Sequence, residues 1–163
     1  MKITDKNIEP SPSSTVLLVR QGKAELEVLM MLRKKNTSFG SSYVFPGGVL
    51  EKTDTKEEEA LSLKEQNLFN EKLNLETGGF AYFSAAIREL FEEAGILLAS
   101  DKKGNFPDYL DINDYRKKLN SGELNWNEFL RQTELTMNYE RLVYFSFWIT
   151  PLRLTHRFTT RFF

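Results

Sequence analysis

The stretch that decides the fold is residues 88–96, which read Arg88-Glu89-Leu90-Phe91-Glu92-Glu93-Ala94-Gly95-Ile96. In a helix, Glu89, Glu92 and Glu93 fall on one stripe, because residues three and four positions apart share a face. Like charges at this spacing cost about 0.2–0.5 kcal/mol per pair, so the stripe needs a counter-charge. A hard divalent cation is one candidate, since it prefers oxygen ligands. The alternative is an ordinary solvated acidic face.

The other face of the same helix is apolar, with residues at helical spacing: Phe83, Ile87, Leu90, Phe91 and Ala94. This pattern predicts a helix that packs on a core and directs its acidic stripe outward or into a cleft. Gly95 is a typical residue for ending such a helix. The short apolar run over residues 96–99 is expected to form a buried strand.

A second informative stretch, residues 43–50, reads Tyr43-Val44-Phe45-Pro46-Gly47-Gly48-Val49-Leu50. It predicts a strand that runs into a turn, because Pro46 cannot donate a ladder hydrogen bond. Gly47 and Gly48 permit a positive φ and allow a ligand to approach the backbone. Taken alone, this stretch predicts only a turn.

The two stretches together resemble the Nudix hydrolase family, whose box reads G-x5-E-x7-R-E-U-x-E-E-x-G-U, where U is apolar. Gly48 fits the first glycine, and residues 88–96 fit the second half of the box without a gap. The first box glutamate is replaced by Asp54, one methylene shorter. Asp54 and Arg88 are 34 positions apart where the pattern needs 8, so about 26 residues are inserted within the box.

The insertion is similar to that of a long-insertion branch that includes a peroxisomal coenzyme A diphosphatase. The resemblance runs from about Thr15 to the last residue. The coenzyme A signature upstream of the box is met only in part, by Arg33 and Gly40. Coenzyme A or an acyl derivative is therefore one expected substrate, beside nucleoside diphosphate sugars, dinucleotides and capped RNA ends.

The resemblance implies an α+β fold, a Nudix-type α/β/α sandwich with a mixed sheet, and hydrolysis of a nucleoside diphosphate linked to another moiety X. It also implies Mg²⁺ or Mn²⁺ as the cofactor. The implied catalytic residues are Glu89, Glu92 and Arg88; the implied metal ligands are Glu89, Glu92, Glu93 and Gly48; and the implied substrate-binding residues are Arg33, Gly47, Gly48 and Arg157. Asp54 is expected to support these groups if the insertion returns it to them. The general base stays open between a box glutamate and a later acid.

Along the chain, we expect a polar tail over residues 1–13 and a Nudix domain over 14–163, with the insertion at about 55–80. The insertion has helical spacing over 55–74 and is predicted to pack beside the site as a lid or a wall. A strong strand is predicted over 142–149 and a last strand over 157–163. Trp126 and Trp148 are expected in the core. The last strand ends on two phenylalanines, at positions 162 and 163, that are expected to be exposed, and this ending predicts that the domain is C-terminally incomplete.

Composition and net charge limit the classes of partner that the chain is expected to bind. The net charge of −1 gives no general attraction to nucleic acid or membranes, and the absence of cysteine excludes thiol catalysis and disulfides. No apolar run approaches membrane-spanning length, and a cytoplasmic protein with a small-molecule partner is expected. A non-catalytic Nudix-like module that binds a ligand or a partner is the alternative, and so is an inactive fragment. The oligomeric state is left open.

Overall fold

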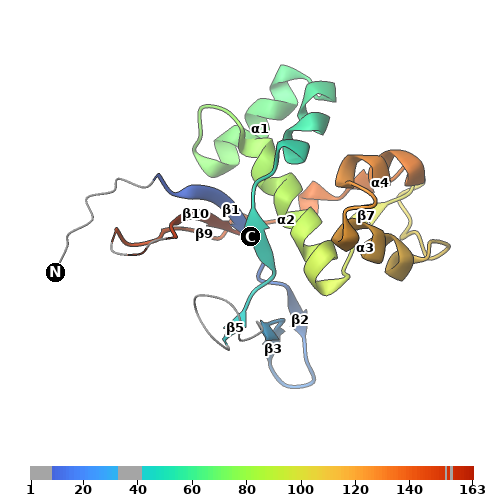
Figure 1. Cartoon of the computed structure of the whole chain (residues 1–163), viewed down its shortest axis with the longest axis horizontal. Helices are drawn as coiled ribbons and strands as arrows, with labels where there is room; N and C mark the ends of the chain where they lie inside the picture. Colours follow the sequence, from blue (N-terminus) through green and yellow to red (C-terminus); the bar gives the residue numbers. More distant parts are fainter. Residues whose placement is uncertain (1–8, 33–41, 153, 155) are drawn as a thin grey trace.

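The computed structural model describes residues 9–32, 42–152, 154 and 156–163 (Figure 1). The strands are β1 Ser11–Thr15, β2 Val19–Gln21, β3 Leu26–Val28, β4 Met31–Leu32, β5 Tyr43–Val44, β6 Gly47–Val49, β7 Ala99–Ser100, β8 Thr136–Met137, β9 Ser146–Ile149 and β10 Phe158–Phe162. The α-helices are α1 Leu63–Leu73, α2 Gly79–Ala94, α3 Ile112–Ser121 and α4 Trp126–Thr133. Two 3₁₀ segments, η1 Lys52–Ala60 and η2 Tyr139–Arg141, complete the described elements.

The main sheet has four strands in the order β6-β1-β10-β9. β1 runs parallel to β10, whereas β6 and β9 pair antiparallel with their neighbours, so the sheet is mixed. The remaining strands form three short antiparallel pairs, β2–β3, β4–β5 and β7–β8. The predicted α+β class with a mixed sheet is therefore confirmed.

Helix α2 is the centre of the molecule and contains the acidic stripe. Its apolar face is fully buried, with Phe83, Ile87, Leu90 and Phe91 in the core. It packs on β1 and β6 of the sheet, while α1 lies along its beginning and α3 near its end (Figure 1). Gly95 ends the helix with φ of 71°, as the sequence predicts. The core thus holds this helix in place while its acidic side stays available.

The predicted helical stretch over 55–74 is found in part: η1 ends at Ala60, the helical path is interrupted at residues 61–62, and α1 then packs against the first turns of α2. Phe69 of α1 makes edge-on ring contacts with Phe80 and Phe83, at centroid distances of 5.3 and 5.0 Å. The buried side chain of Asn70 accepts a 2.7 Å hydrogen bond from the Gly79 N–H. This bond caps an N–H group in the first turn of α2, because Gly78 has no side chain that could do so.

The Asn70 bond leads to a first prediction. Asn70→Ala should lower the free energy of unfolding by about 1–2 kcal/mol, because it leaves a buried N–H without an acceptor. Urea denaturation would measure the change. Asn67→Ala, at an exposed position of the same helix, is the matched control and should stay within about 0.5 kcal/mol of the unmodified chain. Equal effects of the two substitutions would contradict the assignment of Asn70 as a cap.

Several local expectations need correction. β1 begins at Ser11, so the end of the predicted tail belongs to the central sheet. The predicted strand over 142–149 is reduced to β9: residues 142–145 are in no strand, and the Leu142 N–H donates to the Tyr139 carbonyl at the end of η2. The terminal phenylalanines are not exposed: Phe162 is half-buried, and Phe163 packs on Phe83 at a centroid distance of 4.7 Å. The Phe163 side chain is directed toward α2 and is buried in the core there. The linear sequence does not show this direction.

The two tryptophans differ in their surroundings. Trp126 is buried in the core beside Phe91 and Phe129, as predicted. Trp148 is 64% exposed, and its predicted core position is wrong. It pairs with Thr160 on the sheet face opposite α2, the face on which the third layer of the predicted sandwich would lie. Within the described ranges, every helix is too short or too polar to cross a bilayer.

Candidate active site

Arg88 is the hub of the acidic side of α2. Its side chain is only 2% exposed, yet all of its guanidinium nitrogens find partners. Nε and Nη2 donate to the two carboxylate oxygens of Asp54 at 2.9 and 3.0 Å. Nη2 also donates to the Val49 carbonyl, and Nη1 donates to Glu89 at 2.8 Å and Glu92 at 3.2 Å. One buried cation thereby fixes three carboxylates and the end of β6.

Asp54 shows that the insertion begins next to the site. It lies in η1, is fully buried, and also accepts a 2.7 Å hydrogen bond from the Glu51 N–H. Between Asp54 and Arg88, which are 34 positions apart, the chain runs away from the site through α1 and comes back through α2, and this path brings the two side chains together. The expectation that the insertion returns Asp54 to the site is confirmed by this bidentate pair.

The three glutamates are held in different ways. Glu89 and Glu92 point to Arg88, whereas Glu93 Oε2 accepts a 2.8 Å hydrogen bond from the Gly47 N–H. Burial raises the pKa of Glu89 to about 7; the charge of Arg88 opposes this shift, and the charges of Glu92 and Glu93 add to it. Burial likewise raises the pKa of Glu92. Both pKa shifts therefore arise mainly from burial, which the charge of Arg88 opposes and the neighbouring carboxylates reinforce.

Arg88 itself remains a cation. Burial alone would lower its pKa, but the hydrogen bonds and charge of Asp54, followed by the charges of Glu89 and Glu92, raise it above the ordinary arginine value. Its charge is therefore permanent in the folded protein. Because it is enclosed by these partners, Arg88 acts as a positioning residue for the carboxylates.

Gly47 and Gly48 do not form the predicted turn. They belong to β6, pair with Thr15 and Ser14 of β1, and have no positive φ. Their lack of a side chain serves close approach instead. A Cβ at Gly47 would overlap the backbone of β1, lying 2.7 Å from Thr15 Cα, and a Cβ at Gly48 would lie 2.5 Å from Glu89 Cδ. The two glycines therefore allow β6 to approach β1 on one side and the Glu89 carboxylate on the other.

These two contacts predict different outcomes for alanine. Gly48→Ala should displace the flexible end of Glu89, lower hydrolysis about 10- to 100-fold, and change the free energy of unfolding by less than about 1 kcal/mol. Gly47→Ala meets rigid backbone and should destabilise the fold. Turnover and urea denaturation on the same samples would measure both effects. Val49→Ala, at the exposed next position, should change neither, and an unaltered rate for Gly48→Ala would contradict the role of this contact.

The residues of the predicted metal site are of the right chemical type for Mg²⁺ or Mn²⁺, but their side chains are not arranged around one point. Carboxylate oxygens are suitable ligands for Mg²⁺ or Mn²⁺, and the raised pKa of Glu89 marks a place where a cation would be stabilised. In the part of the chain that the structure describes, however, no three acidic or histidine side chains converge closely enough to hold an ion. Glu93 accepts its hydrogen bond from the Gly47 N–H, whereas Glu89 and Glu92 accept from Arg88. Metal ligation by Glu89, Glu92, Glu93 and Gly48 therefore stays a prediction.

Arg116 is a site residue that the sequence analysis missed. From α3, its guanidinium donates to the carbonyls of Glu92 and Glu93, the former at 2.9 Å, and Asn120 adds a 3.2 Å hydrogen bond to the Glu92 carbonyl. These groups compensate the negative end of the α2 dipole. The available signal was the last turn of α2, which has no basic residue of its own.

Of the two predicted substrate arginines, only Arg157 can be located, and it does not contact this site. Arg33 lies outside the described residues. Arg157 donates to the Thr150 carbonyl, and its own carbonyl accepts from Ser11, at the opposite end of β1 from the residue that pairs with Gly47. A substrate contact for either arginine remains a prediction.

The sequence of this chain is similar, over most of its length, to that of a curated protein. No family model matches the chain. The Caenorhabditis elegans protein "Putative nudix hydrolase 7" is 30% identical over 156 residues, an alignment that covers 92% of this chain. The chain spans only 43% of the length of that curated relative.

The fold is also found in a solved structure. The crystal structure of a NUDIX hydrolase from Alicyclobacillus acidocaldarius superposes with a TM-score of 0.75 at 23% identity, over 94% of this chain and 68% of that one. At this identity the likeness concerns the fold. This chain therefore has the Nudix fold, and its sequence similarity and its fold together support its place in the Nudix hydrolase superfamily.

Proposed function

We propose that the chain hydrolyses a diphosphate linkage in a nucleoside diphosphate-X compound, with Mg²⁺ or Mn²⁺ as cofactor. Water adds to one phosphorus, the bridging P–O bond breaks, and two phosphate esters leave. When bound, the divalent ion supplies positive charge to the diphosphate and makes water more acidic. Glu89, Glu92 and Glu93, with the Gly48 carbonyl, are the groups that would hold it.

The observation that carries this proposal is the buried Arg88 network. Arg88 and Asp54 are both nearly inaccessible, and removing charges from water is expensive unless every hydrogen bond is made. A plain surface helix needs no such arrangement. Here the buried pair holds Glu89 and Glu92 at the surface of α2, with one oxygen each turned to Arg88. A pre-positioned carboxylate set is what metal-assisted phosphoryl chemistry requires.

Within this proposal, Glu89 or Glu92 serves as the general base. Arg88 orients both side chains without contacting substrate. Gly47 and Gly48 bring the backbone of β6 next to Glu93 and Glu89. A diphosphate held at these carboxylates would therefore lie beside β6.

A second function has a specific observation in its favour. The described acidic side chains do not converge into a metal site, so a non-catalytic module that binds a nucleotide ligand would also have this architecture. Such a module would bind nucleoside diphosphates without releasing phosphate esters. The two functions differ in turnover, which makes them separable.

The deciding experiment is a product-release assay with Mg²⁺, with Mn²⁺ and with EDTA, over coenzyme A, acetyl-coenzyme A, ADP-ribose and a diadenosine polyphosphate. We expect metal-dependent hydrolysis of at least one compound and none in EDTA. Binding without turnover in both metals, measured by calorimetry on the same protein, would favour the binding module. Coenzyme A in the panel tests the substrate to which the long-insertion branch points.

A further inference from the structure

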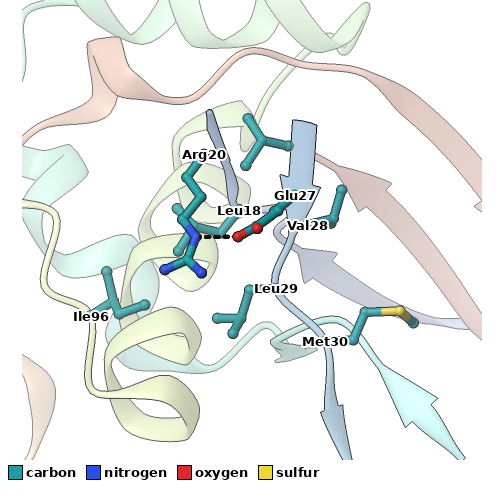
Figure 2. A pocket seen from close by; sticks show the side chains of 8 residues that line it. Leu18, Arg20, Glu27, Val28, Leu29, Met30 and Ile96 are labelled. Carbon is teal, nitrogen blue, oxygen red and sulfur yellow. Dashed lines mark hydrogen bonds and ion pairs between the residues drawn. The ribbon is translucent and has the colours of Figure 1, made fainter. Parts of the chain in front are cut away.

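A pocket lies beside the end of α2, between the β2–β3 hairpin and Ile96 (Figure 2). Its volume is about 470 Å³, within the range of small-molecule sites. Six of the residues that line it are aliphatic or methionine: Leu18, Val19, Val28, Leu29, Met30 and Ile96. The other two, Arg20 and Glu27, are charged. The pocket is thus apolar with a small polar portion.

The hairpin register explains how the lining is arranged. Arg20 pairs with Glu27, and the next same-face positions are Leu18 and Leu29, which share a backbone hydrogen bond of 2.9 Å. The Arg20–Glu27 ion pair, 2.6 Å long, is well exposed, with Arg20 81% accessible. Figure 2 shows Leu18, Leu29 and Ile96 around this pair. A polar rim therefore borders an aliphatic floor.

Two segments of the chain connect the pocket lining with Glu93 over a few residues each. Ile96 is three residues beyond Glu93, so their Cα atoms are at most about 11 Å apart. Leu18 is two residues beyond Val16, whose N–H donates to the Pro46 carbonyl, next to the glycine that contacts Glu93. This proximity along the chain is the basis for connecting the pocket with a diphosphate held at Glu93.

The lining also discriminates between kinds of ligand. Among the described residues that form the pocket there is no aromatic ring, and a nucleobase is usually held by stacking on one. Branched aliphatic side chains and a methionine instead suit a flexible hydrocarbon, which gains free energy mainly by leaving water.

We propose that this pocket binds an aliphatic group of moiety X, and so selects diphosphates that carry a hydrocarbon chain over those that carry a sugar or a second nucleoside. The inference rests on the proposed diphosphatase function and names its substrate class. The Arg20–Glu27 pair stays at the solvent rim, where a polar continuation of the ligand passes it.

A series of β-alkyl esters of adenosine diphosphate (ethyl, butyl and hexyl), with ADP-ribose as reference, tests this inference. Each buried methylene should raise kcat/KM about two- to fourfold, so the hexyl-to-ethyl ratio should be at least about tenfold. Leu29→Trp fills the pocket and should bring this ratio close to one. The ratio is measured on one sample, so it does not depend on the amount of folded protein.

Leu26→Trp is the matched control, because Leu26 lies in the same hairpin next to its turn and does not line the pocket. It should keep the full ratio. A ratio near one in the unmodified chain, or an unchanged ratio in Leu29→Trp, would overturn the inference about the pocket. Hydrolysis of these esters would still support the proposed diphosphatase function.

Calorimetric binding of the same esters separates the two claims further. Tighter binding of the hexyl ester without any hydrolysis would support the pocket and reject the diphosphatase. Equal binding of the hexyl and ethyl esters, with no hydrolysis, would reject both.

Discussion

Replacing Glu93 by glutamine is expected to lower Mg²⁺-dependent hydrolysis about 100- to 1,000-fold, equivalent to roughly 3–4 kcal/mol of the several that a catalytic metal contributes. Glutamine retains an oxygen that can accept the Gly47 N–H, so the β6–α2 contact survives and only the charge is lost. Initial rates over a Mg²⁺ titration would measure the effect. The loss should be accompanied by weaker metal dependence.

Glu71→Gln is the control for this substitution, because Glu71 is an exposed residue of α1 and lies in the insertion. It should leave the rate within about twofold. A Glu93→Gln chain that hydrolyses its substrate as fast as the unmodified chain would reject Glu93 as a ligand. If the unmodified chain has no turnover, Glu93→Gln has no rate to lower, and the result favours the binding-module alternative.

The second large effect concerns stability. Asp54→Ala should lower the free energy of unfolding by about 3–5 kcal/mol, because it leaves the buried Arg88 charge without its bidentate partner. In a chain of this length the midpoint of thermal unfolding should fall by about 6–20 °C. Chemical and thermal denaturation would measure both quantities. Glu89 and Glu92 lose their fixed orientation as well, so turnover should fall with stability.

Two comparisons sharpen this prediction. Asp108→Ala, at an exposed acidic position, should change the free energy of unfolding by less than about 0.5 kcal/mol. The double substitution Asp54→Ala with Arg88→Met removes both charges, so it should recover at least about 1 kcal/mol of the loss. If the double variant is no more stable than Asp54→Ala, the loss does not arise from an unpaired buried charge.

The elements that sequence reasoning predicted well are those with strong local signals. Helix α2 has an apolar face at helical spacing and a glycine at its end, and both features depend only on neighbours along the chain. Helix α1 begins with a capping box at Ser62 and Glu65, which is likewise local. Arg88 pairs with Glu92 one turn away, as its spacing allows.

The wrong predictions concern residues whose structure depends on a segment far away in the sequence. Pro46-Gly47-Gly48 resembles a turn in isolation, yet β1 captures Gly47 and Gly48 into the sheet by pairing with Thr15 and Ser14. Phe163 enters the core because β10 lies beside β1 and directs that side chain toward Phe83. Arg116 could not be connected with α2 in advance, since 24 residues separate it from Glu92 and no motif marks the contact.

The sequence by itself determined the acidic helix, the glycines opposite it and their likeness to the Nudix box, because spacing along one helix sets which side chains share a face. Only the tertiary structure decided that Asp54 and Arg88 form a buried pair, that Glu93 contacts Gly47, and that an aliphatic pocket adjoins them. These contacts join segments separated by tens of residues. Their formation depends on how strands and helices pack, which local propensity does not specify.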